Sequence, residues 1–298
     1  MPSFSFARGE GFFLFPGTGL SFQRRIAPQT KDQMPKSCLV SLAIASACVS
    51  NVFANFADTV VNYATGTGFS AGYIDPNSAL GEPSRVTAGP FGGPVDPFSP
   101  PYLAEQLVSL GAGGSLTLGF SAPILNSPAH PFALDFIIFG SSGFIITNGD
   151  FSGGGVTDGS LFAANTGSTK VSVSADGLNY FELTPSLAPV VDSYFPTDGS
   201  GNFSLPVNPA LNRGSFADKD LAAIRELYSG SAGGTGFDIS WARDSSGQPA
   251  DLASVRYVRI DVLSGTAEID GVSAVPEPSV VSMILAGGGL FLFFRRRA

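Results

Sequence analysis

Short apolar runs separated by turn-forming residues are the feature that most constrains the fold of this chain. Val258, Ile260 and Val262 alternate with Arg259 and Asp261, and an alternation of period two turns one face of a strand toward a core. The runs are bounded by Gly, Pro, Asn and Asp, as strands are. We therefore predict strands at residues 59–64, 108–110, 115–120, 132–139, 144–147, 237–241, 255–263 and 267–274.

The clearest hairpin covers residues 170–183. Val171 and Val173 alternate with serines, and the pair Asp176 and Gly177 tolerates the positive φ that a tight turn needs. The glycine-rich segment 111–114 is predicted to join two further strands in the same strand–turn–strand order. Residues 66–101 are rich in Gly, Pro and Asn and are predicted to form a long loop.

One segment departs from the strand pattern. Residues 215–218 resemble a capping box, and Leu221, Ile224 and Leu227 then follow at helical spacing until Gly230 ends the run. We predict a short helix here that lies on the surface of the sandwich. The fold class is therefore all-β, an antiparallel β-sandwich of jelly-roll type with one short surface helix.

The C-terminal residues 275–298 are the clearest indication of location. Pro276, Glu277 and Pro278 should stay extended and solvated, because proline fixes φ and removes a backbone donor. An apolar run at 280–294 follows, shorter than the ~20 residues that usually cross a bilayer, and we predict a marginal transmembrane helix. The basic cluster Arg295, Arg296 and Arg297 should stay on the cytoplasmic side.

The N-terminal region indicates export independently. A basic start at Met34, an apolar stretch at 39–49 and small or branched residues at 52–54 predict a signal peptide over 34–54, cleaved after Ala54 by signal peptidase. Residues 1–33 are interpreted as a disordered extension produced by an upstream start choice. A twin-arginine signal at Arg24 and Arg25, and a lipoprotein site at Cys48, are weaker alternatives.

The mature chain predicted from these two ends has no thiol, since both cysteines, Cys38 and Cys48, lie in the signal peptide. Between residues 55 and 274 there are 21 Asp and Glu against 8 Lys and Arg. This acidic excess argues against a nucleic-acid partner, because no basic face is available to neutralise phosphates. It keeps a secreted protein soluble and leaves calcium as an alternative.

The tail resembles the PEP-CTERM sorting signal of Gram-negative bacteria, in which a Pro-Glu-Pro motif precedes an apolar segment and a basic cluster. The resemblance implies an exosortase partner, transient residence in the inner membrane, and delivery to the cell envelope, the cell surface or the extracellular matrix. An ordinary C-terminal anchor that happens to contain Pro-Glu-Pro stays open as the alternative.

The predicted domain, residues 55–274, also resembles secreted proteins that carry such tails. The likeness lies in residues 78–81, 109–120, 135–139, 171–181, 236–240, 255–260 and 268–272. Those proteins resemble galactose-binding or discoidin-like sandwiches, which implies binding of carbohydrate or a surface polymer. They usually carry an acidic residue and Asn after the strand at 135–139, whereas this chain has Gly140 and Ser141, so any role of that acid is absent here.

The search for catalytic residues points away from an enzyme. The lone histidine, His130, lies in a proline-rich loop without a second His or a Cys, so neither a catalytic triad nor a zinc site can be assembled convincingly. Paired carboxylates run glycosidases, and Asp135, Asp238, Glu268 and Asp270 are candidates by position, but they suit turn hydrogen bonds equally well.

Two other kinds of binding site are candidates, one for calcium and one in which an aromatic ring stacks on a sugar. Asp75, Asp135, Glu268 and Asp270 are the acids with suitable hard oxygen ligands, although no contiguous Asp-x-Asp-x-Asp-Gly loop exists and we expect no metal cofactor. Trp241 and Tyr257 would stack on a sugar ring if they faced solvent, but a Trp inside a strand pattern is more often part of the core.

The sequence thus predicts an exported, surface-sorted sandwich that binds carbohydrate or extracellular polymer, or forms part of the matrix. A secreted polysaccharide hydrolase and a purely structural surface protein without a ligand are the alternatives. The ligand-binding residues themselves stay unassigned.

Overall fold

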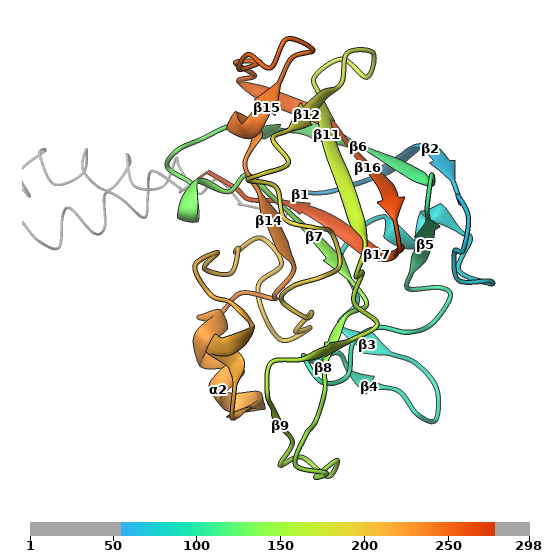
Figure 1. Cartoon of the computed structure of the whole chain (residues 1–298), viewed down its shortest axis with the longest axis vertical. Helices are drawn as coiled ribbons and strands as arrows, with labels where there is room; N and C mark the ends of the chain where they lie inside the picture. Colours follow the sequence, from blue (N-terminus) through green and yellow to red (C-terminus); the bar gives the residue numbers. More distant parts are fainter. Residues whose placement is uncertain (1–54, 278–298) are drawn as a thin grey trace, which may run out of the picture. The chain divides into compact units, whose positions relative to one another are not determined.

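The computed structural model describes residues 55–277, which form antiparallel sheets with one α-helix (Figure 1). The larger sheet has the order β15-β12-β11-β16-β6-β2, and in the second β1, β17, β7 and β14 are neighbours while β5 also pairs with β17. The prediction of an antiparallel all-β protein is confirmed. The strands of the first sheet are β2 (Thr59–Ala64), β6 (Ser115–Leu125), β11 (Ser168–Ser174), β12 (Phe181–Leu183), β15 (Ala242–Arg243) and β16 (Ser254–Ser264), and those of the second are β1 (Asn55–Phe56), β5 (Val108–Gly111), β7 (Phe136–Gly140), β14 (Thr235–Phe237) and β17 (Thr266–Ala274).

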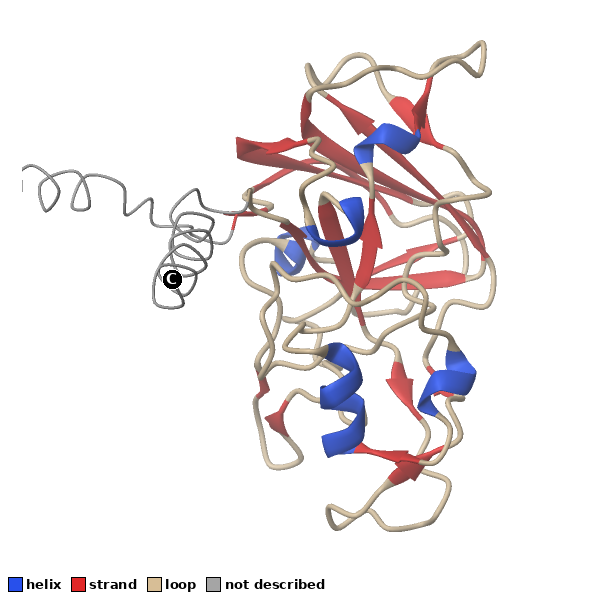
Figure 2. Ribbon diagram, turned by 90° about the vertical axis from the view of Figure 1, so that its left-hand side faces the viewer, coloured by secondary structure: helices blue, strands red, loops and turns tan. Residues whose placement is uncertain are grey.

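The two large sheets share one core, the arrangement of a β-sandwich (Figure 2). Leu118 and Val258 come from the larger sheet, and Phe136 and Ile269 from the second, and all four are buried in the same cluster. Phe136 also stacks on Phe237 of β14, with ring centroids 5.3 Å apart. Burial of each such side chain contributes about 2 kcal/mol, so this cluster is the main source of stability.

The alternation predicted for residues 255–263 is confirmed by β16. Val258, Ile260 and Val262 are buried, whereas Arg259 and Asp261 are only half-buried. Most of β17 is buried on both faces, because Ile137, Phe139 and Phe203 form a second cluster behind its sheet. The hairpin at 170–183 is also confirmed, since β11 pairs antiparallel with β12.

The strands that flank the glycine-rich turn at 111–114 suggest a hairpin, but they do not pair with each other. β5 pairs with β17, and β6 pairs with β16 and β2, so the turn carries the chain from one sheet to the other. The loop at 65–67 packs tightly on it, because a Cβ on Gly114 would lie 2.6 Å from the carbonyl oxygen of Thr65. Residues on this turn therefore need glycine for close backbone approach.

Four predicted strands have the wrong bounds. The strand predicted at 115–120 continues to Leu125 in β6. Residues 131–133 form a 3-10 turn in which Phe132 and Ala133 have positive φ, so β7 begins only at Phe136. Residues 239–241 form another 3-10 turn, because the side chain of Asp238 caps it. The strand predicted at 144–147 is only β8 (Gly143–Phe144), which pairs with β10 (Leu161–Phe162).

Helix α2 (Leu221–Tyr228) forms where a helix was predicted, but its cap and its support differ. Its N-cap is Asp220, whose carboxylate accepts the backbone N–H of Ala223 at 2.8 Å. Ile224 and Tyr228 are buried with Phe144, Val207 and Phe216 in a third cluster. The helix is thus at the surface, over a small core built by loops.

The remaining elements are short. They are β3 (Val86–Thr87), β4 (Gly93–Pro94), β9 (Val156–Thr157), β13 (Lys219–Asp220) and the 3-10 turns Pro76–Ala79, Pro131–Ala133, Arg213–Phe216 and Ile239–Trp241. Residues 66–101 are mostly loop, as predicted.

Several predictions for the two ends of the chain concern residues outside the described part. The extension 1–33, the signal peptide 34–54, the apolar run 280–294, Pro278 and the three C-terminal arginines lie outside it. Within residues 55–277 the structure contains no helix of the length and apolar character that a membrane span requires.

Candidate functional site

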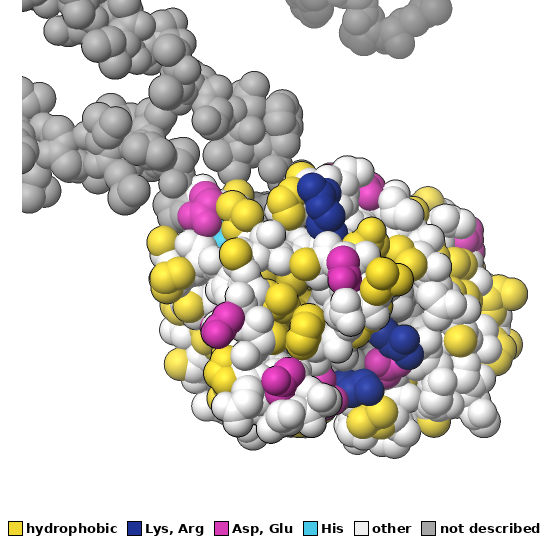
Figure 3. Space-filling view, turned by 90° about the horizontal axis from the view of Figure 1, so that it is seen from above, with side chains coloured by type: hydrophobic (Ala, Val, Ile, Leu, Met, Phe, Trp, Pro, Cys, Tyr) yellow, Lys and Arg dark blue, Asp and Glu magenta, His cyan; other side chains and the backbone are white. Residues whose placement is uncertain are grey.

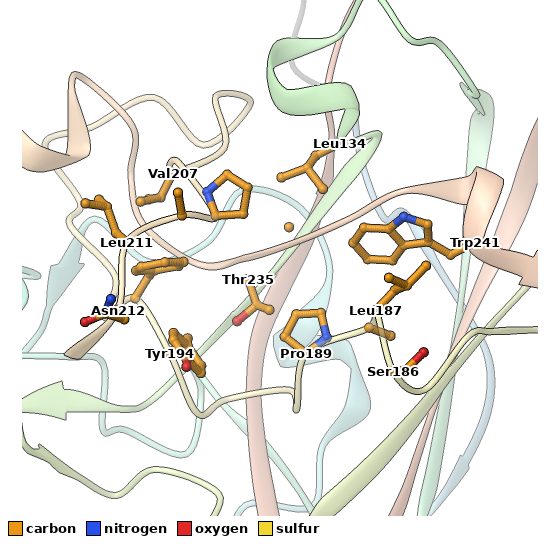
Figure 4. Close-up of a pocket in the computed structure, with 15 residues that line it drawn as sticks. Leu134, Ser186, Leu187, Pro189, Tyr194, Val207, Leu211, Asn212, Thr235 and Trp241 are labelled. Atoms are coloured by element: carbon orange, nitrogen blue, oxygen red, sulfur yellow. The ribbon is translucent and has the colours of Figure 1, made fainter. Parts of the chain in front are cut away.

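A cleft of about 410 Å³ opens between β14, the turn at 239–241 and two proline-containing loops (Figure 4). The indole of Trp241 and the ring of Tyr194 lie on opposite sides of it, with Leu134 and Thr235 between them. Its size falls in the range of small-molecule sites, which are mostly apolar with a few convergent polar groups. Trp241 is half-buried. It packs against the sandwich core, as expected of a core residue, and it also borders this cleft.

Local hydrogen bonds fix Trp241. The carboxylate of Asp238 accepts the N–H of Ser240 at 2.7 Å, which sets the 3-10 turn that ends at Trp241. The carbonyl oxygen of Trp241 then accepts both the backbone N–H and the hydroxyl of Thr184, at 2.9 and 2.8 Å. The indole therefore stands on a rigid support at the mouth of the cleft.

The opposite wall is anchored in the core beneath α2. Tyr194 is 37% exposed and its ring lies 5.4 Å from that of Phe195. Phe195 in turn meets Tyr228 edge-on at 6.4 Å. On the floor, a Cβ on Gly236 would lie 2.6 Å from Leu134, so glycine lets Leu134 fill the base of the cleft. Both aromatic walls are thus preorganised.

The lining limits the chemistry that this cleft can perform. Its polar side chains are the hydroxyls of Tyr194, Ser186 and Thr235 and the amide of Asn212. Among the described residues that line it there is no carboxylate, imidazole, amine or guanidinium. Aromatic faces with a few neutral hydrogen-bonding groups suit an uncharged ring such as a sugar.

A second hollow of about 550 Å³ lies among the loops around β3, β4 and β10. It exposes the rings of Phe91, Tyr102 and Phe162, at 90%, 43% and 43% of their surface. The hydroxyl of Thr87, on its lining, is buried without a hydrogen-bond partner. Because Phe91 is almost fully exposed, this hollow is less preorganised than the cleft at Trp241.

The carboxylates predicted as catalytic candidates have structural partners. Asp135 is fully buried and accepts the N–H groups of Ser127 and Ile239, at 3.0 and 2.8 Å, and its Oδ1 lies 2.7 Å from Nδ1 of His130. Burial raises the pKa of Asp135, an effect that the backbone hydrogen bonds reduce. Asp238 raises it further through like charge. His130 does lie in a loop, but its imidazole is buried and paired with Asp135.

Glu268 and Asp270 serve different parts of β17. Glu268 accepts the hydroxyls of Ser70 and Ser141, at 2.6 and 2.7 Å. Asp270 accepts both the N–H and the hydroxyl of Ser84 at 2.8 Å, and burial raises its pKa to about 7. Both acids therefore tie loops to the second sheet.

The four calcium candidates do not converge. Asp75 accepts the N–H of Asn77 and caps the turn at 76–79, while Asp135, Glu268 and Asp270 have the separate partners given above. Within residues 55–277 no group of three or more His, Cys, Asp or Glu side chains is placed to hold a metal ion. The second aromatic candidate, Tyr257, is half-buried on β16 against Gly177 and does not border the cleft.

Asp192 is a buried acid that the sequence did not indicate. Its carboxylate accepts the N–H groups of Ser142 and Glu268, at 3.0 and 3.2 Å, and burial raises its pKa to about 8. A Cβ at Gly140 would lie 2.2 Å from Oδ1 of Asp192. The glycine at position 140 therefore makes room for an acid from another loop.

Seen from the end of the molecule in Figure 3, the few basic side chains are interspersed with acidic and uncharged ones. No protein family and no curated protein matches the sequence. The site is therefore interpreted from its own geometry.

Proposed function

We propose that this chain is an exported, surface-sorted β-sandwich of jelly-roll type that binds carbohydrate or extracellular polymer in the cleft at Trp241. The observation that supports it most is the pairing of a rigidly held indole with Tyr194 across a lining of neutral polar groups. The galactose-binding or discoidin-like character remains part of this proposal.

The same lining supports binding over hydrolysis. Glycosidases use two carboxyl groups that flank the scissile bond. The four acids considered for that role, Asp135, Asp238, Glu268 and Asp270, do not line the cleft, and their carboxylates accept hydrogen bonds that fix turns and loops.

Glycan binding by the detergent-solubilised full-length chain tests the proposal. Trp241→Ala should weaken binding to a retained glycan or extracellular polysaccharide about tenfold, which corresponds to about 1.4 kcal/mol. Tyr194→Ala should act in the same direction. Phe151→Ala is the matched control, because Phe151 is 80% exposed and does not border the cleft.

The outcomes separate the three functional classes. Unchanged affinity in Trp241→Ala would reject the cleft as the binding site. New reducing ends that disappear in Asp238→Asn or Glu268→Gln would favour the hydrolase. A glycan array without hits, for the wild type at high loading, would favour a structural surface protein.

Sorting is tested separately by the intact mass of protein extracted from the cell surface. If an exosortase processes the tail, the extracted chain should lack the segment after the Pro-Glu-Pro motif. Recovery of a chain that ends at Ala298 in wild-type cells would argue against processing.

A further inference from the structure

The start of the C-terminal tail is fixed to the folded domain at one point. β17 ends at Ala274, and the next N–H, that of Val275, donates to the carbonyl oxygen of Asp135 at 2.8 Å. Val275 itself is buried with Ile137, Phe139 and other residues of the second cluster. Pro276 and Glu277 therefore leave the domain directly beside Asp135.

At this exit the domain presents a buried imidazole to the tail. The side chains of His130 and Asp135 are fully buried, with Nδ1 and Oδ1 2.7 Å apart. Asp135 also accepts the N–H groups of Ser127 and Ile239, so its carboxylate cannot turn away. The imidazole is thus held in one orientation, with its second nitrogen, Nε2, pointing out of the pair.

That second nitrogen faces Glu277. Nε2 of His130 is buried and has no hydrogen-bond partner, and the nearest charged atom is Oε1 of Glu277, at 3.7 Å. The hydroxyl of Ser127 donates to the other oxygen, Oε2, at 3.3 Å. The carboxylate of Glu277 is therefore approached by two side chains of the loop at 127–130.

Two carboxyl groups therefore face the imidazole ring. Oδ1 of Asp135 lies 2.7 Å from Nδ1, and Oε1 of Glu277 lies 3.7 Å from Nε2. Both contacts join a ring nitrogen to a carboxyl oxygen, which is a favourable hydrogen-bonding pair.

We propose that Ser127, His130 and Asp135 form a carboxylate-binding site whose ligand is Glu277 of the chain itself. The folded domain thereby holds the glutamate of the Pro-Glu-Pro motif, and a processing enzyme has to displace Glu277 from His130 before it can grip the motif. Only this last consequence rests on the proposed sorting function. The docking site itself is a property of the folded chain.

The ring of His130 reports directly on the contact, because it is the only histidine in the 298-residue chain. The full-length, ¹⁵N-labelled protein in detergent micelles is compared with Glu277→Gln at the same neutral pH. The ¹⁵N chemical shift of Nε2 should differ between the wild type and Glu277→Gln, because the variant removes the carboxylate that lies 3.7 Å from this nitrogen. The amide of residue 277 should be ordered in the wild type and should approach free-chain mobility in the variant.

Glu226→Gln is the matched control, since Glu226 is an exposed glutamate on α2 and should change neither signal. Identical ring and amide signals in the wild type and Glu277→Gln would overturn the docking site, as would free-chain mobility of residue 277 in the wild type. These measurements contain no processing enzyme, so they do not depend on sorting.

Ser127→Ala separates docking from sorting in cells, because it leaves the Pro-Glu-Pro motif intact. It should increase the mobility of residue 277 in the purified protein. If the tail is processed, removal of the segment after the motif should be faster in Ser127→Ala than in the wild type. Unchanged mobility in Ser127→Ala would remove the serine from the site and contradict the assignment.

Discussion

Replacing Asp192 with asparagine should remove much of the pH dependence of stability between pH 5 and pH 8. The carboxyl group of Asp192 is buried, and burial raises its pKa from 3.8 to about 8. Between these two values the folded chain holds a proton that the unfolded chain has lost. A rise in pH therefore favours unfolding, and the stabilisation present below pH 4 is lost as the pH rises through 8.

The magnitude follows from the shift. Each unit of pKa difference corresponds to about 1.4 kcal/mol, so Asp192 alone should account for a loss of about 1.4 kcal/mol per pH unit over most of this window. The whole shift amounts to about 6 kcal/mol, comparable with the total stability of many domains. Asp192 should therefore make a large contribution to the loss of stability at alkaline pH.

Asparagine keeps the shape of the side chain but cannot lose a proton. Asp192 accepts N–H groups with both of its oxygens, from Ser142 and Glu268, and asparagine has one oxygen. Asp192→Asn should therefore carry a constant cost of about 1 to 3 kcal/mol for the lost hydrogen bond. The two stability curves should cross between about pH 5 and pH 6, with the variant more stable above the crossing.

Urea unfolding of the full-length chain at pH 5, 6, 7 and 8 measures this difference. Trp241 is the only tryptophan and supplies the fluorescence signal. Asp150→Asn is the control, because Asp150 is exposed and hydrogen bonds from Ser152 lower its pKa, so its curve should run parallel to the wild type. A constant gap between wild type and Asp192→Asn across all four pH values would refute the reasoning.

Two further predictions concern residues of the second sheet, Gly140 in β7 and Asp270 in β17. Gly140→Ala should destabilise the fold by about 1 to 3 kcal/mol, because its Cβ would lie 2.2 Å from Oδ1 of Asp192 and 2.8 Å from the carbonyl oxygen of Glu268. Gly119→Ala, whose Cβ would meet only contacts of 3.5 Å, is its control in the same denaturation assay, and equal effects would contradict the steric account. Asp270→Asn should remove a second pH-dependent contribution, lost as the pH rises from about 4 through 7, because burial raises the pKa of Asp270 to about 7. A variant whose unfolding curves keep the wild-type pH dependence would exclude Asp270 as a titrating group in this range.

The elements predicted well from sequence are those with a strong local pattern. β2 has the predicted bounds, and β16 differs from its prediction by one residue at each end. In β16 one face is buried, so the alternation of side chains follows the alternation of environments. The hairpin around Gly177 could be predicted equally well from the sequence, because its turn residues are adjacent in the chain.

The predictions that failed depend on side chains that cap turns or on contacts distant in sequence. A strand was predicted through Trp241, but the side chain of Asp238 caps a 3-10 turn at residues 239–241. Trp241 therefore lies in the wall of the cleft and not in a strand. Asp192 meets Ser142 and Glu268, which are 50 and 76 residues away, and its own segment has no pattern that marks a buried acid. Local periodicity carries no information about such partners.

Asp135 explains why the cleft and the docking site lie together. Its Oδ2 accepts the N–H of Ile239, the first residue of the turn that carries Trp241, and its Oδ1 holds His130. Its backbone oxygen receives the N–H of Val275 at the start of the tail. One buried carboxylate therefore orients both a wall of the proposed glycan cleft and the histidine that faces Glu277. Ile239 and Val275 follow β14 and β17, which both pair with β7, the strand that begins next to Asp135. Both sites therefore exist only once the second sheet has formed.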